Sequence, residues 1–321
     1  MGARSICGYI PRGVAGPIIG IVGPTASGKT DLAMALAETW PVEILVADSR
    51  QVYRGMDIGT AKPDATARAA VPHHLLDLVE PDEAFTVAVW VNRARALLPQ
   101  ILDRGRIPML VGGTGLYVSA LLNGHDYAAQ PRSADARRRL TDELETEGLK
   151  PLATRLAEFS PAAAAITDLR NPRRVVNALE RAERGGGGVV VTSRPYGGRV
   201  ALIGVSWPRE VLYRRIDERA ARLFATGLLD EVRTLLDAGH DPDRRPLSSH
   251  GYGEAARHLA GEWSLEQAIA VTARRTRQYA KRQLTWFRRD PRIVWVAGEG
   301  DPSMQPERAA QADAVLRAAL S

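Results

Sequence analysis

The stretch IIGIVGPTASGKT, residues 18–30, decides the fold of this 321-residue chain. Its first part, residues 18 to 23, is an apolar run that ends in glycine and predicts a short buried strand. The residues from Thr30 to Trp40 show the alanine and leucine spacing of an amphipathic helix. A strand, a glycine-rich loop and a helix in this order predict a phosphate-binding loop in an α/β protein.

The loop GPTASGKT matches the pattern G-x-x-x-x-G-K-[S/T]. Its glycines let successive backbone N–H groups turn toward a phosphate, and the helix N-terminus adds a positive dipole. Lys29 adds a charge and Thr30 can hold Mg²⁺. The pattern does not say whether the phosphates belong to a nucleotide. The predicted diphosphate-binding residues of the loop are Gly23, Pro24, Thr25, Ala26, Ser27, Gly28, Lys29 and Thr30.

The regions around the loop alternate strands with helices, which predicts a parallel sheet. We expect further strands at 42–47, 107–113 and 200–207, and a helix at 87–104. Later helices are expected at 208–223, 228–238, 253–260 and 265–287, with a weak helix at the C-terminal end. The predicted fold class is therefore α/β, a P-loop NTPase-like parallel sheet flanked by helices.

The middle of the chain, from about 132 to 184, is rich in Ala, Arg and Glu and has helical periodicity without a convincing strand. It predicts an inserted, mostly helical domain, followed by a flexible loop that contains Gly185 to Gly188. The expected division is a catalytic core at 18–131 and 199–297, an inserted domain at 132–198, and tails at 1–17 and 298–321.

Composition limits the class of protein. The chain is 45% hydrophobic and 25% charged, with no long apolar run and no secretory signal at its start, so we expect a soluble, cytoplasmic protein. We also expect a monomer. The single cysteine, Cys7, excludes a disulfide framework. The net charge of +6 is ambiguous, because a GC-rich genome also favours arginine. Only clusters, such as the run from Arg274 to Arg289, argue for nucleic acid.

Asp48 stands where the second predicted strand ends, at the edge where parallel sheets build their sites. A carboxylate there can bind a metal, act as a general base or cap the following turn. The spacing alone leaves these roles open.

Five motifs in order carry a resemblance to a known family. The phosphate loop is followed by DSRQVYRGMDIGTAKP at 48–63, HHLLDLVEP at 73–81, LVGGTGLYV at 110–118 and RRTRQYAKRQLTWFRR at 274–289. This set resembles the bacterial tRNA dimethylallyltransferase family, also called the IPP transferase family, over most of the chain. His73 and His74 are expected to be structural or to line the substrate site, because neighbours on a strand point to opposite faces.

The resemblance implies a prenyl transferase. It would transfer the dimethylallyl group from dimethylallyl diphosphate to N6 of the adenosine beside the anticodon of tRNA, position 37, releasing diphosphate. By the same resemblance Asp48 is the base that takes the N6 proton, and Mg²⁺ is the cofactor. The phosphate loop then holds a leaving group.

Two further residues enter the site by resemblance. Thr114 is placed near the reacting centre, and its alternative role is a turn hydroxyl. Arg219 resembles a diphosphate clamp, and its alternative is a solvated helix arginine.

The tRNA side rests on four groups of residues, and the inserted domain is implied to clamp the anticodon arm. Asn177 and Gly253 depart from the family, which usually has basic residues there. Tyr279, Trp286 and Phe287 fall partly on one helix face, so some of them are expected in the core. The tRNA-binding residues implied are Asp48, Ser49, Arg50, Gln51, Arg173, Arg174, Val175, Val176, Asn177, Ser248, Ser249, His250, Gly251, Tyr252, Gly253, Arg274, Arg277, Lys281 and Arg282.

Three other functions compete with this one. The same group could pass to a free adenine nucleotide, the chain could be an ATP-dependent kinase or NTPase, or it could bind nucleic acid without catalysis. The basic helix at 265–287 and the inserted domain favour tRNA over a free nucleotide.

Overall fold

The computed structural model describes residues 15–124, 134–183, 195–297 and 305–320. Cys7 and the glycine run Gly185 to Gly188 lie outside these ranges. The chain divides into two compact units. Unit 1 comprises Met1–Asn123 and Pro195–Ser321, and unit 2 comprises Gly124–Arg194. Each unit is described by itself.

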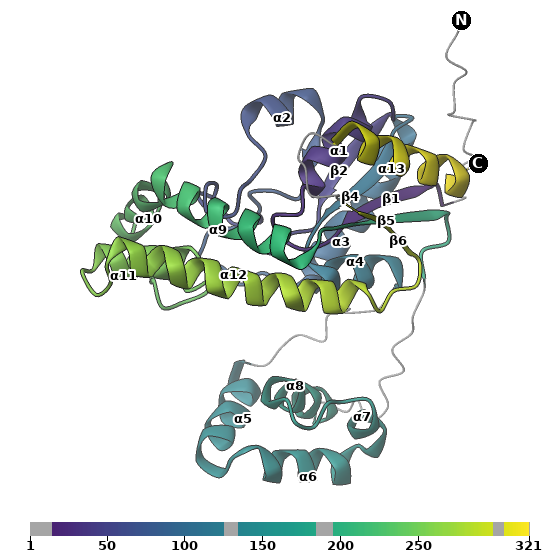
Figure 1. Ribbon diagram of the computed structural model, residues 1–321. Helices are drawn as coiled ribbons and strands as arrows, with labels where there is room; N and C mark the ends of the chain where they lie inside the picture. The colour runs from purple at the N-terminus through teal and green to yellow at the C-terminus, as the bar shows by residue number, and fades with distance from the viewer. Residues whose placement is uncertain (1–14, 125–133, 184–194, 298–304, 321) are drawn as a thin grey trace, which may run out of the picture. The chain divides into compact units, whose positions relative to one another are not determined.

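Unit 1 is built on one parallel sheet in which the strand order is β3-β2-β4-β1-β5-β6 (Figure 1). This confirms the predicted parallel α/β sheet. Strands β1, β2 and β4 are buried along their whole length, as expected for a sheet covered on both faces. The strands are β1 Ile18–Val22, β2 Val42–Val46, β3 His73–His74, β4 Ile107–Gly112, β5 Val200–Ser206 and β6 Ile293–Ala297.

Helices cover both faces of the sheet (Figure 1). On one face lie α1 (Lys29–Ala37) and α13 (Gln305–Leu320), and on the other lie α3 (Val87–Asp103) and α4 (Gly115–Leu122). Trp90 of α3 is fully buried, and its indole N–H donates to the Val46 carbonyl at 3.1 Å. The buried apolar side chains of β1, β2, β4, β5 and α1 belong to one core cluster around the sheet.

The C-terminal helix corrects the expected domain division. Ala312 and Leu316 of α13 are fully buried in the same core as α1 and the sheet. Residues 305–320 are therefore part of unit 1, and the expectation of a tail at 298–321 is wrong for them. The helix itself was expected from the sequence, but its burial against α1 and the sheet was not.

Five more helices lie in the described part of unit 1. Helices α9 and α12 lie side by side, and α12 is the longest helix of the described chain (Figure 1). Ser264 caps α12 by accepting from the Gln267 N–H at 3.2 Å, and the Gln267 side chain accepts from the Ser264 N–H at 3.0 Å. The five helices are α2 Ala65–Ala70, α9 Arg209–Ala225, α10 Leu228–Asp237, α11 Tyr252–Leu259 and α12 Leu265–Phe287.

Unit 2 is helical in its described residues, as its periodicity predicts. Leu140, Leu152, Leu156 and Leu179 pack in its centre and are fully buried. Arg155 and Glu143 form an ion pair at 2.6 Å. Its helices are α5 Ala134–Glu147, α6 Leu149–Phe159, α7 Pro161–Ala165 and α8 Pro172–Ala182. In the part of the chain that the structure describes, no helix has the length and apolarity needed to cross a membrane.

Candidate active site

The phosphate loop connects β1 to α1, and glycines permit its shape. Gly28 at the start of α1 has φ +86°, a left-handed conformation that glycine adopts without strain. A Cβ on Gly23 would lie 2.5 Å from the Val205 carbonyl oxygen of the neighbouring strand. Ala26 takes up φ 62°, and its carbonyl accepts from Arg215 Nε at 2.9 Å. The left-handed backbone at Gly28 and the hydrogen bond from Arg215 to Ala26 hold the loop in this conformation.

Other side chains support the loop from behind. The Trp207 indole N–H donates to the Ser27 carbonyl at 2.8 Å, and Ser27 is fully buried. The Arg215 and Arg308 guanidinium groups lie 4.8 and 4.3 Å from the Trp207 ring centroid. Of the predicted loop residues, Gly23, Pro24 and Ser27 do not line the cavity described next. They contribute to the shape of the loop and do not face the cavity.

A cavity of about 710 Å³ opens in front of the loop. It contains the expected diphosphate groups Lys29, Thr30 and Arg219 together with Asp48. The cavity therefore joins cations at the phosphate loop to a carboxylate at the end of β2. Other predicted residues that line it are Thr25, Ala26, Gly28, Arg50, Gln51, His250 and Gly251.

Lys29 is held at the loop by a hydrogen bond from Nζ to the Pro24 carbonyl at 2.6 Å. Burial lowers the pKa of Lys29 to about 8, although the nearby Asp48 charge opposes this and the Arg219 charge adds to it. Burial also lowers the pKa of Arg219, against the charges of Asp48 and Asp31. Two desolvated cations facing one cavity create a strong preference for an anion.

Asp48 is held by its own turn. Its Oδ1 accepts a hydrogen bond from the Arg50 N–H at 2.9 Å. The second carboxylate oxygen, Oδ2, takes no part in that hydrogen bond. The Thr114 hydroxyl oxygen accepts from the Ser49 N–H at 2.9 Å. Thr114 itself does not line the cavity, so the structure places it beside the cavity, against the backbone that carries Asp48.

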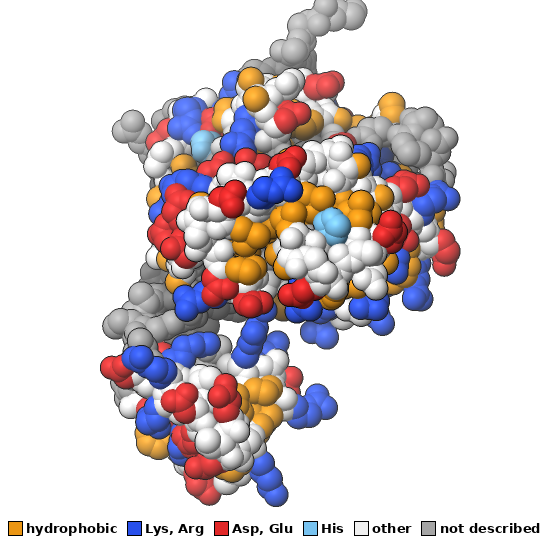
Figure 2. Space-filling model, turned by 90° about the vertical axis from the view of Figure 1, so that its left-hand side faces the viewer, with side chains coloured by type: hydrophobic (Ala, Val, Ile, Leu, Met, Phe, Trp, Pro, Cys, Tyr) orange, Lys and Arg blue, Asp and Glu red, His pale blue; other side chains and the backbone are white. Residues whose placement is uncertain are grey.

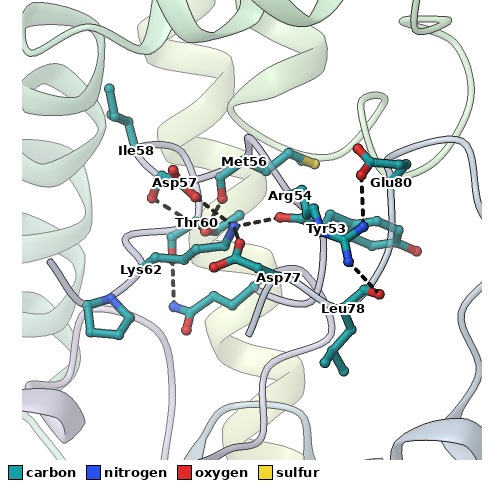
Figure 3. Close-up of polar contacts among 12 residues, drawn as sticks. Tyr53, Arg54, Met56, Asp57, Ile58, Thr60, Lys62, Asp77, Leu78 and Glu80 are labelled. Atoms are coloured by element: carbon teal, nitrogen blue, oxygen red, sulfur yellow. Dashed lines mark hydrogen bonds and ion pairs between the residues drawn. The ribbon is translucent and has the colours of Figure 1, made fainter. Parts of the chain in front are cut away.

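The segment 49–63 that follows Asp48 is organised around a buried lysine (Figure 3). The side chain of Lys62 is 1% exposed, and its Nζ lies 2.6 Å from Asp57 Oδ1 and 2.5 Å from Asp77 Oδ1. It also donates to the Tyr53 carbonyl at 2.5 Å (Figure 3). Gln51 Nε2 donates to the Thr60 carbonyl at 3.0 Å. A buried ammonium needs such partners, and they bring distant parts of the segment together.

Glu231 of α10 holds the same segment from outside. Its Oε2 accepts from the Asp57 and Ile58 N–H groups at 2.9 and 2.7 Å, and Oε1 accepts from the Gly59 N–H at 3.1 Å. The Tyr252 hydroxyl also donates to Glu231 Oε1 at 2.5 Å. Tyr252 is 1% exposed, so the prediction that its side chain contacts tRNA is wrong. It is a structural residue beneath the 49–63 segment.

The predicted segment Ser248–Gly253 is stabilised by a buried carboxylate. Glu254 Oε2 accepts from the Gly251 N–H at 2.6 Å, and Arg275 of α12 is ion-paired with Glu254 and donates to the Ser248 carbonyl. A Cβ at Gly253 would lie 3.2 Å from the Ser248 carbonyl oxygen, so a side chain there would need a small shift of the turn.

His250 and Gly251 of this segment reach the cavity. Arg50 Nη1 lies 2.6 Å from His250 Nε2, and Arg50 Nη2 lies 2.6 Å from His250 Nδ1. In a neutral imidazole only one of the two ring nitrogens can accept a hydrogen bond. Burial and the charge of Arg50 lower the pKa of His250 to about 2, so the ring is neutral. The Tyr279 ring lies 5.0 Å from His250 and 5.3 Å from the Arg50 guanidinium carbon.

The predicted basic residues are exposed to different degrees. Arg274, Lys281 and Arg282 of α12 are exposed, whereas Arg277 is ion-paired with Asp217. Arg173 and Arg174 are exposed on α8 of unit 2. Lys and Arg side chains project from several parts of the surface of that unit (Figure 2).

Within unit 2 the structure corrects two predictions and qualifies a third. Val175 and Val176 are buried in the helical core, so their side chains cannot contact tRNA. Asn177 Oδ1 accepts from Arg137 Nη1 at 2.8 Å. A guanidinium from α5 therefore lies beside the position where the resemblance implied a basic residue, and Glu180 Oε2 is 3.5 Å from the same Arg137 atom.

Sequence reasoning missed the cavity face of α12. Thr272, Thr276, Tyr279 and Gln283 all line the cavity. Their spacing of four, three and four residues puts them on one helix face, and that spacing is the signal that could have found them.

A parallel sheet with a phosphate loop, two desolvated cations and a carboxylate in one cavity defines a P-loop group-transfer enzyme. Comparisons with known proteins give the particular family. The family model described as IPP transferase matches residues 51–290, and the model described as isopentenyl transferase matches residues 17–70. The chain belongs to the IPP transferase family.

Individual relatives agree with the family models. The chain is 45% identical to a tRNA dimethylallyltransferase of Syntrophobacter fumaroxidans, over 87% of this chain and 83% of the relative. It is 45% identical to that of Geobacter metallireducens, over 87% and 92%. The crystal structure of the tRNA isopentenylpyrophosphate transferase of Bacillus halodurans is similar, with a TM-score of 0.69 at 38% identity, over 94% of this chain and 97% of that one.

Proposed function

We propose that this chain transfers the dimethylallyl group from dimethylallyl diphosphate to N6 of the adenosine beside the anticodon of tRNA. Family membership supports the reaction, and one structural observation supports the assignment of parts. The observation is that Asp48 shares a cavity with Lys29 and Arg219. A base and a leaving-group site within one cavity are what this transfer requires.

In the proposed step, a bond forms between N6 and the allylic carbon while the bond from that carbon to the diphosphate oxygen breaks. The electron pair leaves with diphosphate, and the N6 proton passes to Asp48. The adenine amine needs this base because its lone pair is delocalised into the ring. Lys29 and Arg219 stabilise the charge that grows on the diphosphate.

The residues present fit a bound Mg²⁺. The Thr30 hydroxyl and the Asp48 carboxylate line the same cavity, and both supply the oxygen donors that Mg²⁺ prefers. We place Thr30 as the ligand and Asp48 as the base. When bound, the ion neutralises part of the diphosphate charge.

On the tRNA side, we propose that Asp48, Ser49, Arg50 and Gln51 hold the target base at the cavity. The exposed Arg173, Arg174, Arg274, Lys281 and Arg282 contact phosphates. Adenosine in a folded anticodon loop must be splayed out before its amine can reach Asp48. The side chains around His250 and Tyr279 give the cavity an aromatic wall for such a base.

The test uses labelled dimethylallyl diphosphate, Mg²⁺ and three acceptors. These are unmodified tRNA, the same tRNA with guanosine in place of the target adenosine, and AMP. Label in the first alone is expected. Label in AMP would favour the free-nucleotide reaction, and label in none would overturn the proposal.

A further inference from the structure

Gln283 of α12 links two loops that lie far apart in the sequence. Its Oε1 accepts from the Thr25 N–H of the phosphate loop at 2.8 Å, and its Nε2 donates to the Gly113 carbonyl at 2.8 Å. Gln283 is 5% exposed and lines the cavity. Both ends of one buried amide are thus used to join the two loops.

The glycines of the second loop fit α12 closely. A Cβ on Gly113 would lie 2.1 Å from Gln283 Nε2, and a Cβ on Gly115 would lie 2.2 Å from the Trp286 ring. Neither glycine has a positive φ between +20° and +160°. Close approach of α12 is therefore what requires glycine at these two positions.

The two loops carry opposite halves of the proposed chemistry. The phosphate loop holds the leaving diphosphate. The loop after β4 carries Thr114, whose hydroxyl oxygen accepts from the Ser49 N–H next to Asp48. Because Gln283 is hydrogen-bonded to both loops, it adds a second connection between them to the pairing of β1 with β4.

Thr25 also has a changed role. The backbone N–H of Thr25 donates to Gln283 Oε1 and so anchors the phosphate loop to α12. This N–H is therefore not available to bind a phosphate. The remaining contribution of Thr25 to the cavity is its side chain.

We propose that Gln283 is a positioning residue for allyl transfer, which sets the phosphate loop relative to the loop that supports Asp48. The expected effect on the rate of allyl transfer rests on the proposed function. A loss of alignment lowers the rate of the bound complex more than it weakens tRNA binding, because misplacement of reacting groups by a fraction of a bond length is costly.

The first variant is Gln283→Met, which keeps the size of the side chain and removes both hydrogen bonds. We expect kcat to fall about tenfold or more, with a nearly unchanged KM for tRNA. Pyrophosphate binding, measured by calorimetry without tRNA, is expected to weaken about fivefold. The control is Gln278→Met, five residues earlier on the same helix and exposed, which is expected to leave pyrophosphate binding unchanged.

A second variant, Gly113→Ala, tests the same link from the other side. Its new Cβ displaces the Gln283 amide, so it should reproduce the fall in kcat. With Gln283→Ala in the background the space is free, and Gly113→Ala should then cost little. Gly197→Ala is the control, because its Cβ meets only an ordinary contact at 3.8 Å.

The outcomes separate the two proposals. Wild-type protein that transfers no label contradicts the proposed function, while the calorimetry still tests Gln283. Wild-type kcat and pyrophosphate affinity in folded Gln283→Met would overturn the positioning role. A loss of activity that only follows the loss of folded protein, monitored by circular dichroism, would overturn it as well.

Discussion

The Thr114 hydroxyl oxygen accepts a hydrogen bond from the Ser49 N–H at 2.9 Å. This contact joins the loops after β4 and β2 directly beside Asp48. The backbone repeats the connection, because the Thr114 N–H donates to the Ala47 carbonyl at 3.0 Å. The carboxylate that we propose as the base is therefore held from both sides of its position in the chain.

Asp48→Asn tests the base. The asparagine Oδ1 can still accept from the Arg50 N–H, so the turn is expected to keep its shape. Transfer to tRNA should fall about 10²- to 10⁴-fold, while pyrophosphate binding stays nearly unchanged. Single-turnover transfer and calorimetry measure the two quantities. If this variant lost pyrophosphate binding, Asp48 would have to be assigned as a metal ligand and not as the base.

The lowered pKa of Lys29 leads us to expect that diphosphate binding depends on pH. Its pKa in the free protein is lowered to about 8, so the charged form is lost as pH rises through that value. A bound diphosphate favours the charged form, so binding takes up a proton above pH 8. Pyrophosphate affinity should then fall by up to about tenfold per pH unit. Lys29→Ala should bind weakly and lack this decline, and an equal decline in both proteins would rule out Lys29 as its source.

Tyr252→Phe separates a structural role from an RNA contact. The substitution removes the hydroxyl that donates to Glu231 Oε1 and leaves the ring buried. The free energy of unfolding should decrease by about 1 kcal/mol, measured by urea denaturation. The affinity for tRNA should be unchanged. A large loss of tRNA affinity at full stability would restore the RNA-contact role.

Arg173 and Arg174 test the basic surface of unit 2. Each is exposed, and each substitution to alanine should reduce the slope of log affinity against log salt by about one if the residue contacts a phosphate. Arg138→Ala is the control, because that exposed arginine is ion-paired with Asp135 at 2.7 Å. Unchanged slopes in the two variants would exclude phosphate contacts by them. Filter binding at several salt concentrations provides the measurement.

The sequence predicts best the parts of the fold that depend on local chemistry. The strand, loop and helix around Lys29 follow from neighbouring residues alone. Helix α12 spans Leu265–Phe287 as expected, because Ser264 and Gln267 form a capping box at its start. In contrast, β6 was not expected, although its sequence IVWVA is rich in β-branched and aromatic residues; it is half exposed and pairs with β5 at the edge of the sheet.

The site shows the same division. Lys29, Asp48 and Arg219 were expected from motifs and meet in one cavity. Tyr252 was misassigned because its partner, Glu231, lies on another helix and is recognised only in the folded chain. The spacing along α12 could have placed Gln283 on the cavity face, but it does not reveal the partners of Gln283, which lie 258 and 170 positions away. Val175 and Val176 came with their motif, and their apolar character already indicated a core position.

The central claim is that the phosphate loop holds a leaving group and not an energy source. The most direct measurement is the yield of pyrophosphate against modified adenosine, with dimethylallyl diphosphate, tRNA and Mg²⁺ present and ATP absent. The claim predicts one pyrophosphate for each dimethylallyl group that appears on tRNA. A requirement for ATP, or release of orthophosphate in step with modification, would contradict it.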